Sequence, residues 1–73
     1  MNVEMQIQTI AASIEKRRKS LGLTQAELAA LAGVSARFVY DLENGKKTIS
    51  MDKFLAVAKV LGYNLNLKIA VNE

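Results

Sequence analysis

Residues 24–47, TQAELAALAGVSARFVYDLENGKK, decide the fold of this chain. Apolar residues recur there at helical spacing, which predicts one short helix over residues 25–32 and a second over residues 36–44. Only the three residues 33–35, Gly-Val-Ser, separate the two helices. A connection this short sets the helices at a steep angle and leaves the second free to project, which is the helix-turn-helix arrangement.

The residues at the helix ends and in the turn support this arrangement. Thr24 and Glu27 have the spacing of a capping box, and Ser35 is a favoured N-cap for the second helix. Gly33 can adopt a left-handed conformation without a Cβ penalty, and Ala29 is small where the two helices are expected to cross. The apolar residues expected to hold the pair together are Leu28, Val34, Val39 and Leu42. The second helix is also expected to bury Leu31 and Ala32, and Phe38 to support the inward side of the third.

The flanking sequence adds one helix on either side of this pair. Helical spacing predicts a first helix over residues 9–20, which ends in a run of cations followed by Gly22. A fourth helix is expected to begin at Ser50 and Asp52 and to end at Gly62. Its apolar face is expected to consist of Phe54, Leu55, Ala58 and Leu61.

Beyond residue 62 the apolar period changes from helical to alternating. A period of two predicts a half-buried strand over residues 63–71, and a weaker alternation over residues 2–8 indicates either a short strand or disorder. The apolar positions of the C-terminal segment are Tyr63, Leu65, Leu67, Ile69 and Val71. Because an isolated strand is unstable in water and exposes an unpaired edge, we expect this segment to form a dimer contact with a second chain.

Composition limits the classes of function that the chain can have. Its 73 residues are expected to form one domain, residues 1–73, with a core over residues 9–61 that is marginal for its size. The absence of histidine and cysteine removes the usual catalytic bases, nucleophiles and soft-metal ligands, so we expect no enzyme activity, no metal and no cofactor. A net charge of +3 is compatible with nucleic acid. Neither a signal peptide nor a membrane span is expected, and the lack of cysteine fits a reducing cytoplasm.

Residues 21–50, within a wider match over residues 14–61, resemble the DNA-binding domain of lambda repressor and Cro, the Xre family. The motifs LGLTQAELA and LENGK carry most of the resemblance. The alternating segment after the fourth helix also resembles the layout of HipB-type antitoxins, in which a C-terminal strand pairs with its symmetry mate. The resemblance implies a mainly α, lambda-repressor-like domain of four to five helices. Its C-terminal strand, with or without the N-terminal one, would form an intersubunit sheet.

The resemblance also implies roles for individual residues. Gln25, at the start of the second helix, is expected to hold a DNA phosphate. Ser35, Ala36 and Arg37 open the helix that enters the major groove. Arg37 is the candidate for a bidentate contact to guanine, with a phosphate contact as the alternative, and Ala36 could meet only an apolar group such as a thymine methyl. The other expected DNA contacts are Tyr40, Asn44, Lys46 and Lys47.

The two acidic residues of the third helix, Asp41 and Glu43, are expected to have different roles. Asp41 shares the exposed face of the third helix, where its carboxylate repels phosphate unless it accepts from cytosine or pairs with a neighbouring cation. Arg18 and Glu43 match positions that form a salt bridge in phage repressors, so we expect an ion pair between the first and third helices. Lys16 and Arg17 would then be free to attract the duplex.

The sequence therefore predicts a transcriptional repressor that binds double-stranded DNA as a homodimer on a pseudo-palindromic operator, in the cytoplasm at the nucleoid. The HipB-like layout favours the antitoxin and autorepressor of a toxin–antitoxin operon, with a kinase-like toxin as partner. The alternatives are a stand-alone phage- or plasmid-type Xre regulator and a protein–protein module that has lost DNA binding. No small-molecule ligand is expected, because the chain leaves no room for a separate sensing domain.

Overall fold

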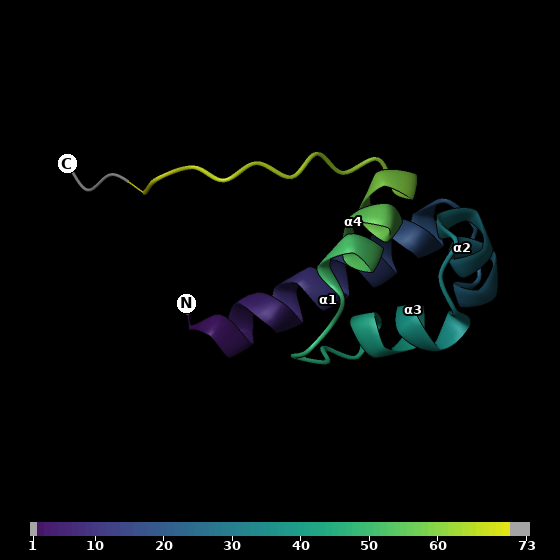
Figure 1. Cartoon of the computed structure of the whole chain (residues 1–73), viewed down its shortest axis with the longest axis horizontal. Helices are drawn as coiled ribbons and strands as arrows, with labels where there is room; N and C mark the ends of the chain where they lie inside the picture. Colours follow the sequence, from purple (N-terminus) through teal and green to yellow (C-terminus); the bar gives the residue numbers. More distant parts are fainter. Residues whose placement is uncertain (1, 71–73) are drawn as a thin grey trace.

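Four helices make up the computed structural model, which describes residues 2–70 (Figure 1). They are α1, Val3–Ser20; α2, Gln25–Ala32; α3, Ala36–Glu43; and α4, Met51–Val60. The mainly α fold is as predicted, and the bounds of α2, α3 and α4 agree with the sequence prediction to within one or two residues. None of the helices in the described part of the chain has the length and apolar character needed to cross a membrane.

The core lies where α2, α3 and α4 meet the C-terminal half of α1. Its buried members are Ile14, Leu28, Ala29, Val39, Leu42, Val57 and Leu61. Ala29 is 3% exposed, which agrees with its predicted place at a close contact between helices. Phe38 packs against the same core.

Two predictions about the apolar faces are wrong. Leu31 of α2 is 63% exposed and Leu55 of α4 is 45% exposed, whereas Val57, which was not predicted, is fully buried. Each of the two exposed leucines lies roughly 100° around its helix from the centre of the buried stripe. Short helices that contact their neighbours on one side bury only a narrow stripe, so a leucine just outside it stays in solvent.

The starts of α2 and α3 have the predicted caps. Thr24 Oγ1 accepts from the backbone N–H of Glu27 at 3.0 Å, and Glu27 Oε1 accepts from the N–H of Thr24 at 2.8 Å, which completes the capping box. Ser35 Oγ accepts from the N–H of Phe38 at 3.0 Å. Gly33 ends α2 with a φ of +72°, the left-handed conformation that favours glycine.

The start of α4 differs from this pattern. Ser50 holds the N-cap position, but its side chain makes no capping hydrogen bond. Its hydroxyl instead donates to the carboxylate of Asp52, which also accepts from the backbone N–H of Lys53 at 2.9 Å. The acidic residue therefore provides the contact to the first turn that a serine at the N-cap usually makes.

The first helix begins at Val3, so the prediction of a strand or disorder over residues 2–8 is wrong. Asn2 is its N-cap and accepts from the N–H of Met5 at 2.8 Å. The segment VEMQIQ alternates, but Val3, Ile7 and Ile10 also have the spacing of one helical face. Such a short apolar pattern fits both periods, and here the cap and the continuous helix that follows decide in favour of the helix.

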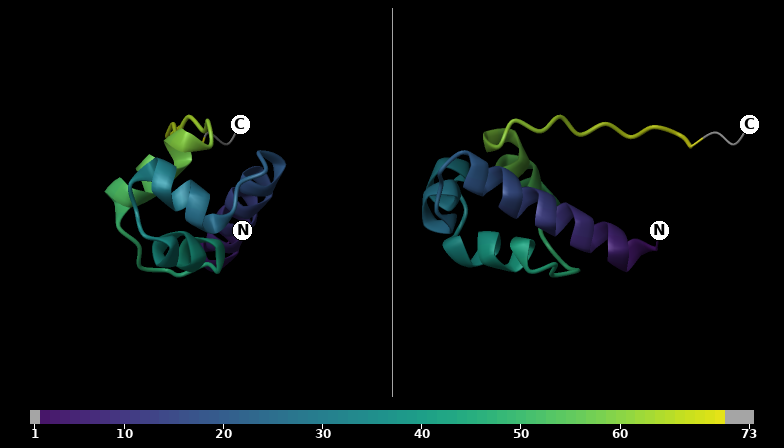
Figure 2. Two further views of the ribbon diagram at one scale, coloured as in Figure 1. Left: turned by 90° about the vertical axis from the view of Figure 1, so that its right-hand side faces the viewer. Right: turned by 180° about the vertical axis from the view of Figure 1, so that it is seen from behind.

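The segment after α4 runs away from the helices as an extended trace (Figures 1 and 2). The hydroxyl of Tyr63 anchors its beginning by donating to the carbonyl of Ser13 at 3.2 Å. No strand occurs within residues 2–70, so the predicted C-terminal strand stays a prediction that requires a second chain. Of its predicted positions, Leu67 and Ile69 are 104% and 91% exposed, and Val71 lies outside the described residues.

Candidate nucleic-acid interface

One side of α3 forms an outer surface of the molecule. Its inner side carries the buried residues Val39 and Leu42, and Ala36, Arg37 and Tyr40 are exposed. Figure 1 shows α3 along one edge of the fold, with the end of α4 on the opposite edge. The helix can therefore approach a large partner without disturbing the core.

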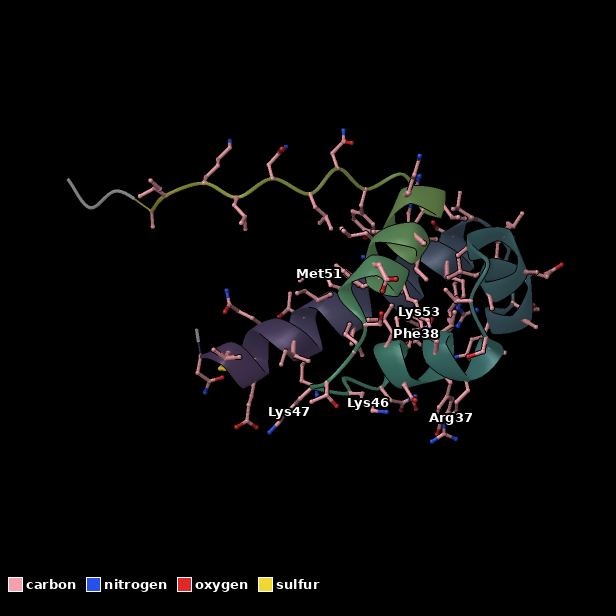
Figure 3. The ribbon with its side chains drawn as sticks, in the orientation of Figure 1. Arg37, Phe38, Lys46, Lys47, Met51 and Lys53 are labelled. Carbon is pink, nitrogen blue, oxygen red and sulfur yellow. The ribbon has the colours of Figure 1, made fainter. Side chains whose placement is uncertain are left out.

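The structure brings most of the predicted DNA contacts to this side of the molecule. In Figure 3 the side chains of Arg37, Lys46 and Lys47 project in the same direction, away from the helices. The exposed predicted contacts are Ser35, Ala36, Arg37, Tyr40, Asn44, Lys46 and Lys47. They come from the first turn of α3, its outer face and the loop that follows it. We call this set the α3 surface.

Gln25, the remaining predicted contact, is half-buried at the start of α2. Its side-chain Nε2 donates to Glu43 Oε1 at 3.0 Å. This hydrogen bond uses one of the two amide protons and fixes the side chain next to the end of α3. The phosphate contact predicted for Gln25 would use the second amide proton and the N-terminal turn of α2.

Arg18 and Glu43 form the ion pair between α1 and α3. Arg18 Nε donates to Glu43 Oε2 at 2.7 Å and Arg18 Nη2 donates to Oε1 at 3.0 Å, which makes the contact bidentate. Arg18 Nη1 also donates to the carbonyl of Leu23 at 2.8 Å. The hydrogen bond to Glu43 is the main reason that the pKa of Arg18 is raised above its ordinary value. Since the Glu43 side chain is only 2% exposed, this cluster is a structural support beneath the α3 surface.

Asp41 faces two cations of the α3 surface. Its Oδ1 lies 3.0 Å from Arg37 Nε and its Oδ2 lies 3.7 Å from Lys46 Nζ. The guanidinium carbon of Arg37 also lies 5.2 Å from the centre of the Tyr40 ring, a cation–π distance. The sequence left two alternatives open for Asp41, and in the structure its carboxylate pairs with neighbouring cations.

The loop after α3 is shaped by contacts with α3 itself. Asn44 Nδ2 donates to the carbonyl of Tyr40 at 2.8 Å, and the backbone N–H of Lys46 donates to the carbonyl of Asp41 at 3.0 Å. Gly45 between them has a φ of +75°, which a side chain would make unfavourable. These bonds place the two loop lysines, Lys46 and Lys47, beside the end of the helix.

The first turns of α1 also lie against this loop. A Cβ added to Gly45 would collide with the side-chain amide of Gln8, and Lys47 Nζ lies 3.5 Å from Glu4 Oε2. Sequence reasoning missed Glu4 and Gln8, because it placed the start of the first helix beyond them. The N-cap signal of Asn2 was the pattern that could have found them.

Arg17, predicted with Lys16 to add long-range attraction to the duplex, is exposed and also contacts the end of α4. Its Nε donates to the carbonyl of Leu61 at 2.9 Å, at the end of α4. A cation at this place satisfies a carbonyl that the helix itself leaves unpaired, and it suits the negative end of the helix dipole. Arg17 therefore ties α1 to α4, and Lys16 is exposed.

Comparisons with known proteins agree with this geometry. The model of the family HTH_3, Helix-turn-helix, matches residues 14–68, which include α2, α3 and α4 and part of α1. A protein of Sinorhizobium fredii (strain NBRC 101917 / NGR234), the uncharacterized HTH-type transcriptional regulator y4mF, is 43% identical over 58 residues. That alignment covers 80% of this chain and 76% of the relative.

Proposed function

This chain belongs to the Xre/Cro-type helix-turn-helix family HTH_3, and we propose that it represses transcription by binding a pseudo-palindromic operator as a dimer. Membership makes it a transcriptional regulator with a helix-turn-helix DNA-binding domain. The proposal adds the direction of regulation, the dimer and the roles of single residues. It also includes a cytoplasmic location at the nucleoid.

The observation that carries the proposal is the α3 surface, where three cations project from one side of the fold (Figure 3). We assign Ser35, Ala36 and Arg37 to the base edges of the major groove, with Arg37 as the bidentate partner of a guanine. Their position at the start of α3 is the part of a recognition helix that reaches deepest. The groups assigned to the sugar–phosphate backbone are Gln25, Tyr40, Asn44, Lys46 and Lys47.

The C-terminal segment is assigned to the dimer contact. Leu65, Leu67 and Ile69 are exposed on a segment that contributes almost nothing to the core of its own chain. One face of the segment, together with α1 and α4, lines an apolar groove that includes Ile10, Leu55 and Leu65. Pairing two such segments would bury these side chains, and a two-fold dimer on DNA needs its two copies of α3 about one helical turn apart.

The same layout supports an antitoxin that represses its own operon and binds a kinase-like toxin. The test is genetic and biochemical together. A toxin or kinase reading frame should adjoin the gene, and its product should co-purify with this chain when the two are co-expressed. An adjacent frame of unrelated type, with no co-purification, would leave a stand-alone regulator.

The DNA-binding part of the proposal is tested by salt dependence. A dimer that neutralises about 6 phosphates should bind a duplex with log K falling against log salt at a slope near −5. Lys46→Ala should reduce this slope by roughly 2, because each dimer loses two contacts. Lys59→Ala serves as control, because Lys59 is an exposed lysine in the last turn of α4, on the opposite edge from α3. Weak binding without salt dependence would instead indicate a protein–protein module.

A further inference from the structure

We propose that Asp41 is a specificity-determining residue, which positions Arg37 for base readout and weakens binding to DNA of arbitrary sequence. The proposal rests on the DNA-binding function above and goes beyond it, because a carboxylate on a DNA-binding face would ordinarily be only a liability. The feature that motivates it is the placement of Asp41 between Arg37 and Lys46.

Asp41 restrains the arginine from one side. The carboxylate oxygen Oδ1 lies 3.0 Å from Arg37 Nε, and the arginine and aspartate are four residues apart on α3, the spacing at which helical side chains meet. The carboxylate contacts Nε, so the two Nη groups at the end of the guanidinium stay available for a base. The Asp41 side chain is 17% exposed, whereas that of Arg37 is 77% exposed.

Tyr40 restrains the arginine from another side. The Arg37 guanidinium carbon lies 5.2 Å from the centre of its ring, so the planar group is held by a charge and by an aromatic face. An exposed arginine without such contacts samples many rotamers, and binding a base then requires ordering one of them. Restraint in the free protein reduces that entropic cost, which is the usual benefit of preorganisation.

The second effect of Asp41 concerns DNA of any sequence. Its Oδ2 lies 3.7 Å from Lys46 Nζ, so the carboxylate offsets part of the charge with which Lys46 attracts phosphate. A neighbouring phosphate also meets the negative charge of Asp41 itself. Contacts to phosphate do not distinguish sequences, so weakening them lowers the background of non-specific binding.

The chain contains a matched control for this argument. Glu4 also lies beside a cation of the α3 surface, with its Oε2 3.5 Å from Lys47 Nζ, and the two side chains are 74% and 64% exposed. Glu4→Gln therefore removes the same charge as Asp41→Asn from the same side of the molecule. Only Asp41, however, is paired with Arg37 among the described residues.

The experiment starts from a pool of random duplexes of about 20 base pairs, from which the wild-type protein enriches its preferred sequence. Dissociation constants are then measured for the preferred duplex, for its single-base-pair variants and for a scrambled duplex. A bidentate arginine–guanine contact discriminates roughly 5- to 150-fold, so Asp41→Asn should lower the preference at one base pair of each half-site by about fivefold or more. The same variant should bind the scrambled duplex more tightly than the wild type does.

The control should behave differently. Glu4→Gln should tighten binding to every duplex by a common factor of about two- to fivefold, because it relieves only repulsion of the backbone. Its preference among the single-base-pair variants should equal that of the wild type. If Asp41→Asn behaved as Glu4→Gln does, the positioning role of Asp41 would be overturned.

Two further variants test the route through which Asp41 acts. Arg37→Lys keeps the charge but loses the planar fork, so it should lose preference at the same base pair while binding to scrambled DNA persists. In an Arg37→Ala background, Asp41→Asn should change no base preference. A remaining change would mean that Asp41 contacts a base directly and would overturn the proposal.

If the wild type enriches no sequence from the pool, the proposed function itself fails, and this result is seen before any variant is made.

Discussion

Asp41 and Glu43 lie two positions apart on α3 and have opposite surroundings. The Glu43 side chain is 2% exposed and accepts from both Arg18 and Gln25, whereas Asp41 faces the outer cations. The Arg18–Glu43 pair could be expected from the resemblance to phage repressors. The partners of Asp41 could be expected only in part: the spacing to Arg37 is visible in the sequence, but Lys46 reaches the carboxylate only through the turn at Gly45.

We predict that Glu43→Ala strongly destabilises the fold. It leaves the Arg18 guanidinium, with a side chain 9% exposed, without its carboxylate partner. Breaking a buried pair in this way costs about 3–5 kcal/mol. The measurement is urea unfolding at neutral pH, followed by circular dichroism.

Lys19→Ala provides the control for that prediction. Lys19 Nζ lies 3.2 Å from Glu15 Oε2, but the two side chains are 65% and 45% exposed. Removing such a pair should change the free energy of unfolding by less than about 1 kcal/mol. Equal effects of Glu43→Ala and Lys19→Ala would show that the buried pair gives no special support to α3.

The helices themselves were largely predictable, because local signals mark their ends. Thr24, Ser35 and Gly33 each have the conformation or hydrogen bond that their residue type favours. The start of α1 was not predictable from periodicity, because its first residues fit both a strand and a helix. The contact between Gln8 and the loop at Gly45 is tertiary, and no pattern within residues 2–8 predicts this contact.

At the scale of the element we predict that Thr24→Ala destabilises α2 by about 1 kcal/mol, since it removes the acceptor for the N–H of Glu27. Ser50→Ala is the matched change, because Ser50 occupies an N-cap position but makes no capping hydrogen bond. It should therefore have the smaller effect in thermal unfolding. A larger loss for Ser50→Ala than for Thr24→Ala would contradict the assignment of the caps.

Glu27 gives the same element a pH dependence. Hydrogen bonds with Thr24 lower the pKa of Glu27 below the ordinary value; the bond with the Thr24 backbone has the larger effect, and the bond with the Thr24 side chain adds to it. A carboxylate with a lowered folded-state pKa stabilises the fold above its unfolded-state pKa and loses this contribution as the pH falls through the folded-state pKa.

We therefore predict that the stability difference between the wild type and Glu27→Gln shrinks as the pH is lowered from neutral into the acid range. Urea unfolding at a series of pH values measures this difference. Asp52, whose pKa is lowered mainly by its hydrogen bond with Ser50, contributes with the same sign in both proteins and cancels in the comparison. A difference that stayed constant with pH would show that the Glu27 carboxylate does not stabilise the fold.

At the scale of the whole molecule, the four helices form a domain and the C-terminal segment extends away from it (Figure 2). The sequence indicates the alternating character of this segment, but not the surface that covers it. That surface would belong to the proposed second chain, because Leu67 and Ile69 are 104% and 91% exposed within residues 2–70.

We predict that Ile69→Asp prevents the proposed dimer from forming, since it places a charge in the proposed interface at a side chain that is 91% exposed in the single chain. Sedimentation in the analytical ultracentrifuge measures the change in mass. Asn64→Asp makes the same change of charge at a polar position of the alternation and should leave the dimer intact. An Ile69→Asp protein that still sediments as a dimer would exclude this segment as the contact.

If α3 reads DNA sequence through Arg37, the variant Arg37→Ala should lose base-pair discrimination. Against the duplex that the wild type prefers, the variant should lose roughly 1–3 kcal/mol of binding free energy, and it should lose its preference at one base pair of each half-site. Lys59→Ala, on the opposite edge of the fold, should match the wild type. An equal loss of affinity for every duplex would make Arg37 a phosphate contact, and that result would contradict the claim.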